Sequence, residues 1–271
     1  MVEDISVAII GKPNVGKSTL FNKILSKNIS LVDNIPGTTK DIIEQRIFYK
    51  NNSFLIFDTG GLKKKSKSKS EEQTYITKNT LQAIYKSNIV FFLVEANAGL
   101  TKADKQICRF ILDKGKGLVF IINKIDLTEN SREVVKEYFY SNVDLFDDAL
   151  LHEPVSMNSV ISGFPNKIFE LALEIFRNSN KNINSKFLNI VIQNLVLKNR
   201  IPISNKYRPK IKFIKQVSTS PMIFKVFGSQ LNKISHDYKR YLCKGILKKT
   251  NIKGVRVFLK FISAKNPYVA N

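Results

Sequence analysis

The sequence is poor in cysteine and histidine and contains no tryptophan. Among its 271 residues, the two cysteines, Cys108 and Cys243, and the two histidines, His152 and His236, lie far apart along the chain. Disulfide frameworks and zinc sites need several such residues at short spacings, so neither kind of site is expected. We expect both cysteines to be reduced thiols packed inside the protein.

Long apolar runs are also missing. The longest apolar stretches have only the length of strands, and no basic segment followed by an apolar one opens the chain. Neither a membrane span nor a signal peptide is therefore indicated. We expect a soluble, cytoplasmic protein with no membrane partner.

Acidic residues are nearly absent from the last third of the chain. Residues 180–271 hold 20 lysines and arginines against one acid, Asp237, whereas residues 1–179 hold 24 against 21. A compositional bias toward lysine acts on the whole chain, so it does not explain why only the first region keeps its acids. We therefore expect the last third to face a polyanion.

A polar run, NSNKNINSK at 178–186, separates two segments with helical apolar periodicity. Such runs of Asn, Ser and Lys are typical of connections between domains. A chain that is 43% hydrophobic and 271 residues long can bury two modest cores. We expect one domain at 1–178 and a second at 179–271.

Short apolar runs alternate with helical patterns in the first region, which predicts an α/β domain. The expected strands are 5–10, 42–50, 53–58, 88–94, 117–122 and a short one ending near Val155. Several lack polar alternation, as strands of a parallel sheet covered on both faces do. Only two residues separate the second run from the third, so these two should pair as a hairpin, which is typical of Ras-like sheets.

The last third predicts a smaller α+β domain with the order helix, strand, strand, helix, strand. The expected elements are 183–198, 210–217, 222–227, 235–250 and 254–261. In the second helix, Tyr238, Tyr241, Leu242 and Gly245 recur at helical spacing and should form its core face.

The segment GKPNVGKS follows the first strand and matches the phosphate-loop pattern G-x-x-x-x-G-K-[ST]. Its backbone N–H groups and the following helix N-terminus should surround a β-phosphate. Lys17 should bridge the β and γ oxygens, and the Ser18 hydroxyl should ligate Mg²⁺. The expected nucleotide-binding residues here are Gly11, Lys12, Pro13, Asn14, Val15, Gly16, Lys17 and Ser18.

The segment NKID follows the strand at 117–122 and predicts guanine as the base. The carboxylate of Asp126 can accept from both N1–H and the N2 amine of guanine, whereas adenine offers neither donor and leaves it unpaired. Lys124 should lie over the ring, and Asn123 should tie this loop to the phosphate loop. The contact residues expected here are Asn123, Lys124, Ile125 and Asp126.

Two segments between these loops predict a switch that senses the γ-phosphate. Asp58 ends a strand and should hold a water on Mg²⁺, the N–H of Gly61 should meet the γ-phosphate, and Thr38 or Thr39 should close on the metal. We expect Mg²⁺ to be held by Ser18, Thr39 and Asp58. The nucleotide-contacting residues expected in the DTGGL segment are Asp58, Thr59, Gly60, Gly61 and Leu62.

These motifs, with PVSMNS at 154–159 and KNPYV near the end, resemble the Der (EngA) family of bacterial ribosome-assembly GTPases. The matching part of that family is its second GTPase domain and its KH-like domain. The resemblance implies a Ras-like P-loop GTPase domain, a KH-like domain, GTP or GDP as ligand, and the large ribosomal subunit and its rRNA as partners. It implies guanine contacts at Ser156 and Met157, where the family has Ser-Ala.

Hydrolysis should be slow in the isolated protein. Leu62 stands where Ras-type enzymes have a glutamine that orients water, and it can neither donate nor accept. The resemblance implies that Asn14 helps to hold K⁺ beside the phosphates and so restores positive charge there. We take Lys17, Thr39, Gly61 and Asn14 as the catalytic residues, and we expect a monomer away from the ribosome.

Three interpretations stay open at this point. The first is a hydrolysing GTPase switch in assembly of the large subunit. The second is an Era-like GTPase, against which the absence of G-x-x-G from residues 180–271 argues, because a KH-type grip on single strands needs that motif. The third is a GTP-sensing RNA-binding module with little hydrolysis. The run from Lys63 to Lys69 is either a solvated loop or an rRNA contact.

Overall fold

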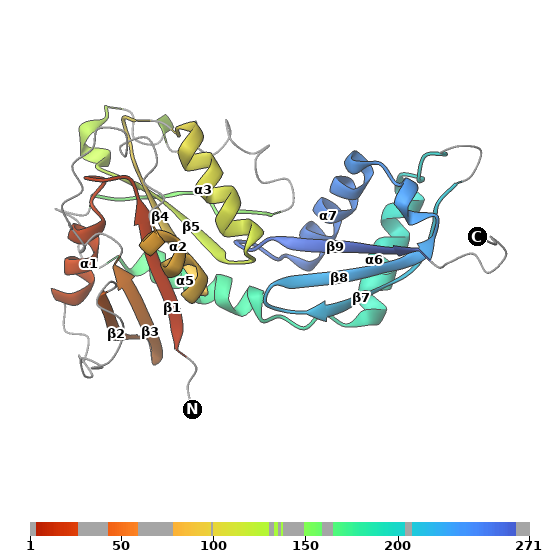
Figure 1. Ribbon diagram of the computed structural model, residues 1–271, viewed down its shortest axis with the longest axis horizontal. Helices are drawn as coiled ribbons and strands as arrows, with labels where there is room; N and C mark the ends of the chain where they lie inside the picture. Colours follow the sequence, from red (N-terminus) through yellow and green to blue (C-terminus); the bar gives the residue numbers. More distant parts are fainter. Residues whose placement is uncertain are drawn as a thin grey trace. The chain divides into compact units, whose positions relative to one another are not determined.

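A computed structural model describes residues 4–26, 43–58, 78–98, 100–129, 133, 134, 137, 149–158, 165–203 and 208–263. The chain divides into two compact units, each with its own sheet (Figure 1). The first unit is Met1–Phe146 with Leu151–Arg177, and the second is Asp147–Leu150 with Asn178–Asn271.

The first unit is built on a six-stranded sheet of order β2-β3-β1-β4-β5-β6. Only β2 runs antiparallel to its neighbour, β3; the other pairs are parallel. The strands are β1 (Ile5–Gly11), β2 (Ile43–Tyr49), β3 (Asn52–Asp58), β4 (Ile89–Glu95), β5 (Gly117–Asn123) and β6 (Val155–Ser156).

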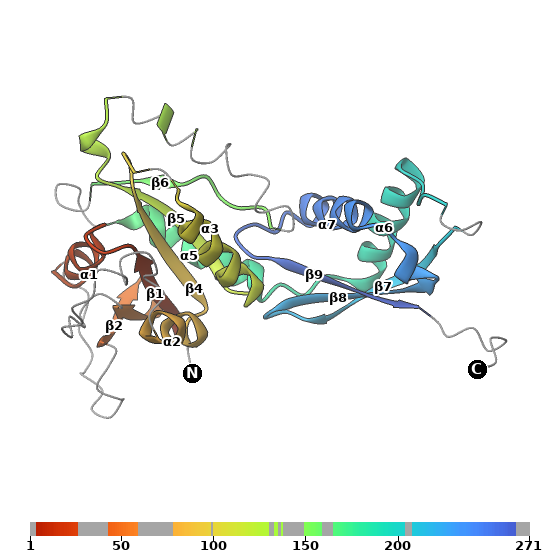
Figure 2. The ribbon, with the colours of Figure 1, turned by 45° about the horizontal axis from the view of Figure 1, so that its top comes forward.

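Helices cover both faces of this sheet, with α2 and α3 on one face and α1 and α5 on the other (Figures 1 and 2). Phe169 of α5 is fully buried and meets the rings of Phe54 and Phe91 edge-on, at 5.0 and 5.8 Å between centroids. Because β1 and β5 are buried along their whole length, polar groups can collect only where the strands end. The helices are α1 (Lys17–Ser26), α2 (Lys78–Lys86), α3 (Lys102–Asp113) and α5 (Asn166–Ser179).

The second unit is a three-stranded sheet of order β7-β8-β9 with α6 and α7 on one face (Figures 1 and 2). Strands β7 and β8 are antiparallel, and β8 and β9 are parallel. Its elements are α6 (Ser185–Lys198), β7 (Lys210–Ser218), β8 (Met222–Ser229), α7 (His236–Thr250) and β9 (Val257–Ser263).

The two helices of the second unit approach each other closely. A Cβ atom at Gly245 would lie 2.4 Å from a methyl carbon of Leu195, so a larger residue would require the Leu195 side chain to move. The Tyr241 hydroxyl donates to the Leu195 carbonyl over 2.9 Å, and the Tyr238 hydroxyl donates to the Asn199 carbonyl. The expected core face of α7 therefore packs against α6.

The α/β class of the first unit, with its single antiparallel edge, and the α+β class of the second are confirmed. The last strand begins three residues later than expected, because α7 ends with Asn251 in the left-handed conformation and the chain turns again at Gly254, with φ +78°. Both cysteines are buried thiols packed inside the protein, as expected. Among the helices that the structure describes, none is long and apolar enough to cross a membrane.

Candidate functional site

The phosphate loop joins the carboxyl end of β1 to α1. A Cβ atom at Gly11 would lie 2.4 Å from the Leu93 carbonyl oxygen, so glycine is needed there to let β1 and β4 pass closely. Asn14 and Gly16 have φ angles of +64° and +100°, which Asn and Gly tolerate better than other residues do. The glycines at 11 and 16 thus serve two purposes: the first admits the neighbouring strand, and the second allows the loop to turn.

The side chain of Lys17 folds back into this loop. Its ammonium donates to the carbonyls of Gly11 over 2.9 Å and of Lys12 over 2.6 Å, which places the positive charge inside the curve of the backbone. Ser18 follows in the first turn of α1 and is exposed. A cation, an exposed hydroxyl and a helix N-terminus together favour a phosphate and its metal ion.

The NKID segment lies beside the phosphate loop. Asn123 ends β5 and is buried, and its side-chain amide donates to the Val15 carbonyl over 2.8 Å. This hydrogen bond joins the two loops across 108 positions of sequence, as expected for Asn123. Asp126 lies in a short 3-10 turn, Ile125–Leu127, and is exposed.

Lys124 is oriented by a partner that the sequence did not indicate. Its backbone is left-handed, with φ +58°, and its ammonium forms an ion pair with the carboxylate of Glu95, the last residue of β4. The register pairs Glu95 with Asn123, which places this carboxylate beside the end of β5. That Lys124 lies over a guanine ring stays a prediction.

The backbone N–H of Met157, which is the expected guanine contact, already donates a hydrogen bond within the sheet. The Met157 N–H donates to the Ile122 carbonyl over 2.8 Å and continues the pairing of β5 with β6. A guanine contact from this amide would have to share or replace that bond. The Met157 side chain is 7% exposed, so the larger residue is accommodated by burial, whereas Ser156 beside it is exposed.

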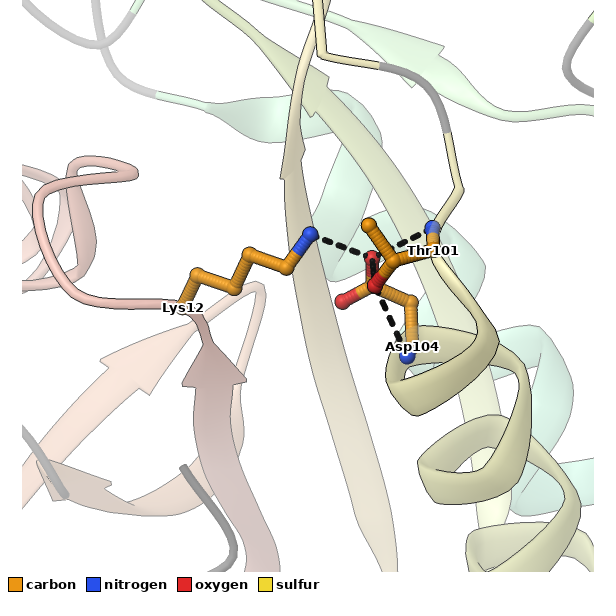
Figure 3. A network of polar contacts seen from close by, with 3 residues as sticks. All are labelled: Lys12, Thr101 and Asp104. Atoms are coloured by element: carbon orange, nitrogen blue, oxygen red, sulfur yellow. Dashed lines mark hydrogen bonds and ion pairs between the residues drawn. The ribbon is translucent and has the colours of Figure 1, made fainter. Parts of the chain in front are cut away.

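Lys12 connects the phosphate loop to the start of α3 (Figure 3). Its ammonium lies 2.7 Å from Oδ2 of Asp104, a carboxylate whose side chain is 2% exposed. The same oxygen accepts from the backbone N–H and the hydroxyl of Thr101, over 2.8 and 2.6 Å. Thr101 and Asp104 form a capping box, so the N-terminus of α3 and one end of the phosphate loop share a single buried carboxylate.

The T-x-x-D spacing of Thr101 and Asp104 could have revealed the cap from sequence. It could not have revealed Lys12 as the partner, because 92 positions separate Lys12 from Asp104. The ion pair arises only when β1 and β4 lie side by side. Sequence reasoning missed this contact, as it missed the pair of Lys124 with Glu95.

The remaining expected site residues lie outside the described part of the chain. These are Thr38, Thr39, Thr59, Gly60, Gly61, Leu62 and the run from Lys63 to Lys69. Asp58 ends β3, next to β1, but its side chain is not described. In the described ranges no group of three His, Cys, Asp or Glu side chains could hold a metal ion. A magnesium site here would instead combine the Ser18 hydroxyl with phosphate oxygens, water and few carboxylates, as Mg²⁺ often does.

In this fold the Lys17 ammonium occupies the phosphate loop, and a hydrogen bond joins that loop to the NKID segment. These features define a P-loop GTPase domain. Two family models match the chain: 50S ribosome-binding GTPase over residues 6–124, and the C-terminal KH-domain-like part of EngA bacterial GTPase enzymes over residues 182–261. The chain therefore belongs to the Der (EngA) family of GTPases.

Curated relatives agree over almost the whole chain. GTPase Der of Hamiltonella defensa is 32% identical over 98% of this chain and 53% of its own length, and GTPase Der of Buchnera aphidicola is 33% identical over 98% and 58%. The chain thus spans about half the length of the curated relatives it matches. A crystal structure of an Aquifex aeolicus Era variant with GDP and AlF₄⁻ covers 95% of this chain and 93% of its own, with 20% identity and a TM-score of 0.47.

Proposed function

We propose that this chain is a GTP-binding and GTP-hydrolysing switch that acts in assembly of the large ribosomal subunit in the cytoplasm. The observation that carries the proposal is the bond from Asn123 to Val15, which joins a loop suited to phosphates to a loop suited to guanine. Residues 180–271, with 20 cations and one acid, supply a surface for a polyanion. The family model described as a 50S ribosome-binding GTPase supports the large subunit as partner.

Base recognition is assigned to Asp126. Its carboxylate is exposed and lies one turn after a buried strand, so it can reach a ligand without breaking the core. Guanine presents two donors to it, whereas adenine presents an acceptor at N1 and leaves the carboxylate unpaired. Ser156 and Ile125 lie at the neighbouring strand end and turn, where they complete the wall of the base site.

Phosphate binding is assigned to the loop from Gly11 to Ser18. The ammonium of Lys17 now contacts two loop carbonyls and exchanges them for β and γ oxygens when nucleotide binds. Ser18, Thr39 and Asp58 would hold Mg²⁺, directly or through water, and Asn14 would help to hold K⁺. Bound Mg²⁺ and K⁺ neutralise charge that develops on the phosphates. Gly61 and Thr39 act as the switch contacts that sense the γ-phosphate.

The large subunit is assigned to the second unit, through contacts with rRNA phosphates. Sedimentation of the chain with large-subunit particles, in 50 to 200 mM salt and with GDP or a non-hydrolysable GTP analogue, tests this. If about five cations meet phosphates, affinity should fall on the order of 100-fold across that range. Binding should also be tighter with the analogue than with GDP. Affinity that ignores both salt and nucleotide would overturn the proposal.

A second candidate, a GTP-sensing RNA-binding module that barely hydrolyses, is favoured by Leu62 alone. Both candidates share GTP binding and RNA binding, so only turnover separates them. A steady-state rate at saturating GTP that does not exceed uncatalysed hydrolysis, in K⁺ as well as Na⁺, would select this second candidate.

A further inference from the structure

The three-stranded sheet of the second unit has one face that none of this unit's described helices covers. Helices α6 and α7 lie on the other face (Figure 2). The alternate residues Met222, Phe224 and Val226 of β8 are buried against that face. The intervening β8 residues, Ile223, Lys225 and Phe227, therefore point to the open face. Strand register extends each of them into a row across β7 and β9.

The middle row consists of lysines only. Lys225 pairs with Lys215 on β7 and with Lys260 on β9, so three lysines stand side by side on strands whose backbones lie about 5 Å apart. Like charges placed directly opposite each other destabilise a sheet. Residues 180–271 offer one acid to relieve them, Asp237, and its carboxylate is bound by Arg240 over 2.8 Å. Among the described residues of 180–271, no other acidic side chain is present to offset the charge of the three lysines.

The adjacent row is apolar and aromatic. Phe213 and Phe227 stack with 4.5 Å between ring centroids and 16° between planes, and Ile262 continues the row on β9. Phe213 is 46% exposed and Ile262 37%, although large apolar side chains are usually better covered. Along each strand this row lies two residues from a lysine, about 7 Å away.

We propose that this open sheet face binds an unpaired segment of RNA. The lysine row contacts backbone phosphates, and a base stacks on the Phe213–Phe227 pair beside it. Alternating cationic and aromatic rows suit a single strand, whose phosphates and bases lie on opposite sides, better than a duplex, whose bases are hidden. The proposal rests on the proposed function, because it names the part of rRNA that the second unit takes up.

The stacked pair of Phe213 and Phe227, and not the charge, favours RNA over a protein partner. An acidic protein surface would neutralise the lysines but would leave the exposed Phe213 ring without a matching flat group. Every nucleobase presents such a flat face, whatever the sequence, so stacking gives affinity with little sequence preference. The absence of G-x-x-G from residues 180–271 does not oppose this proposal, because the RNA would bind to the sheet and not at the position of a KH-type G-x-x-G loop.

The first test uses the whole chain with GDP and a single-stranded RNA of about 12 nucleotides that carries 2-aminopurine. Stacking should quench the 2-aminopurine fluorescence on binding. Phe213→Leu keeps an apolar side chain but removes the ring, so it should abolish the quench and weaken binding about 5-fold or more. Phe187→Leu is the matched control, because Phe187 is 43% exposed on α6. It should leave both readouts unchanged.

The second test removes charge from two places. Lys215→Gln with Lys225→Gln should weaken single-strand binding on the order of tenfold and reduce the slope of log affinity against log salt by about 1.4. Lys248→Gln with Lys249→Gln removes the same charge from the last turn of α7. That pair should change the slope by less than half as much. Equal effects of the two pairs would mean that only net charge matters and would overturn the proposal.

Failure of this proposal can be told from failure of the proposed function. If large-subunit particles still bind with salt and nucleotide dependence while Phe213→Leu changes neither quench nor affinity, the sheet face does not bind unpaired RNA and the function stands. A duplex with the same number of phosphates that binds as tightly as the single strand would overturn the proposal in the same way. If the particles themselves fail to bind, the function is wrong.

Discussion

The two units hold positive charge in different ways. In the first, cations near the site have fixed partners: Lys12 binds the buried Asp104, Lys124 binds Glu95, and Lys17 binds two carbonyls. In residues 180–271, which make up most of the second, 20 cations share one acid. Fixed partners orient a charge toward one small ligand, whereas a surplus creates a field that attracts an extended polyanion. The comparison predicts sharp, position-specific effects of mutation in the first unit and graded, salt-dependent ones in the second.

The largest expected effect is at the base site. Asp126→Asn should weaken GTP about 100-fold or more, because the amide cannot accept from both guanine donors and leaves one of them unpaired. The same change should favour XTP, whose C2 carbonyl accepts from an amide. Titration of both nucleotides by calorimetry checks this, with unfolding curves to show that the variant folds. Unchanged GTP affinity would remove the assignment of Asp126.

Hydrolysis should show the next largest effect. Turnover should rise on the order of 10- to 100-fold when K⁺ replaces Na⁺ at equal ionic strength, the range expected for one well-placed charge at the phosphates. Asn14→Ala should abolish the difference between the two salts while GTP still binds. Phosphate release at saturating GTP is the measurement. Equal rates in K⁺ and Na⁺ for the unaltered chain would rule out the role of Asn14 in holding K⁺.

A smaller effect is expected for the Lys12–Asp104 pair. Asp104→Asn keeps a side chain able to cap α3 but leaves Lys12 without a charged partner. Because Lys12 is one-third exposed, the loss in unfolding free energy should be about 1–3 kcal/mol, below that of a fully buried pair. The control is Asp113→Asn on the same helix, since the exposed pair of Asp113 with Arg109 should contribute about 0.3 kcal/mol.

A double-mutant cycle with Lys12→Met separates the ion pair from the cap. If the pair accounts for the loss, Asp104→Asn should cost much less in the Lys12→Met background. Additive losses would show that Asp104 acts only on α3. Nucleotide affinity measured on the same variants shows whether the pair also positions the phosphate loop.

Local sequence patterns were enough for the fold and for locating the loops at Gly11–Ser18 and Asn123–Asp126, because strand length, glycine spacing and turn residues are short-range properties. They were insufficient where the sheet brings distant residues together. Asp104 could be recognised as a cap but not as the partner of Lys12, and nothing near Lys124 indicated Glu95. The lysine row needs the register of three strands, and β7 contains irregularities between Ile211 and Phe213 that no alternation pattern predicts.

The smallest expected effect concerns the buried, uncharged phenol of Tyr238 in the second unit. Tyr238 donates to the Asn199 carbonyl, and burial, with a smaller effect of Tyr241, raises the pKa of Tyr238 to about 12. The ordinary value near 10 applies to the unfolded chain, so the folded state favours the neutral phenol. This contribution to stability is complete below pH 10 and is lost as the pH rises through about 12.

Tyr238→Phe should cost about 1 kcal/mol of unfolding free energy at pH 7, and it should remove the share of the stability loss above pH 10 that comes from ionisation of Tyr238. Urea unfolding at pH 7, 10 and 11 checks both points. If the variant and the unaltered chain lost stability in parallel above pH 10, the titrating group would be another one.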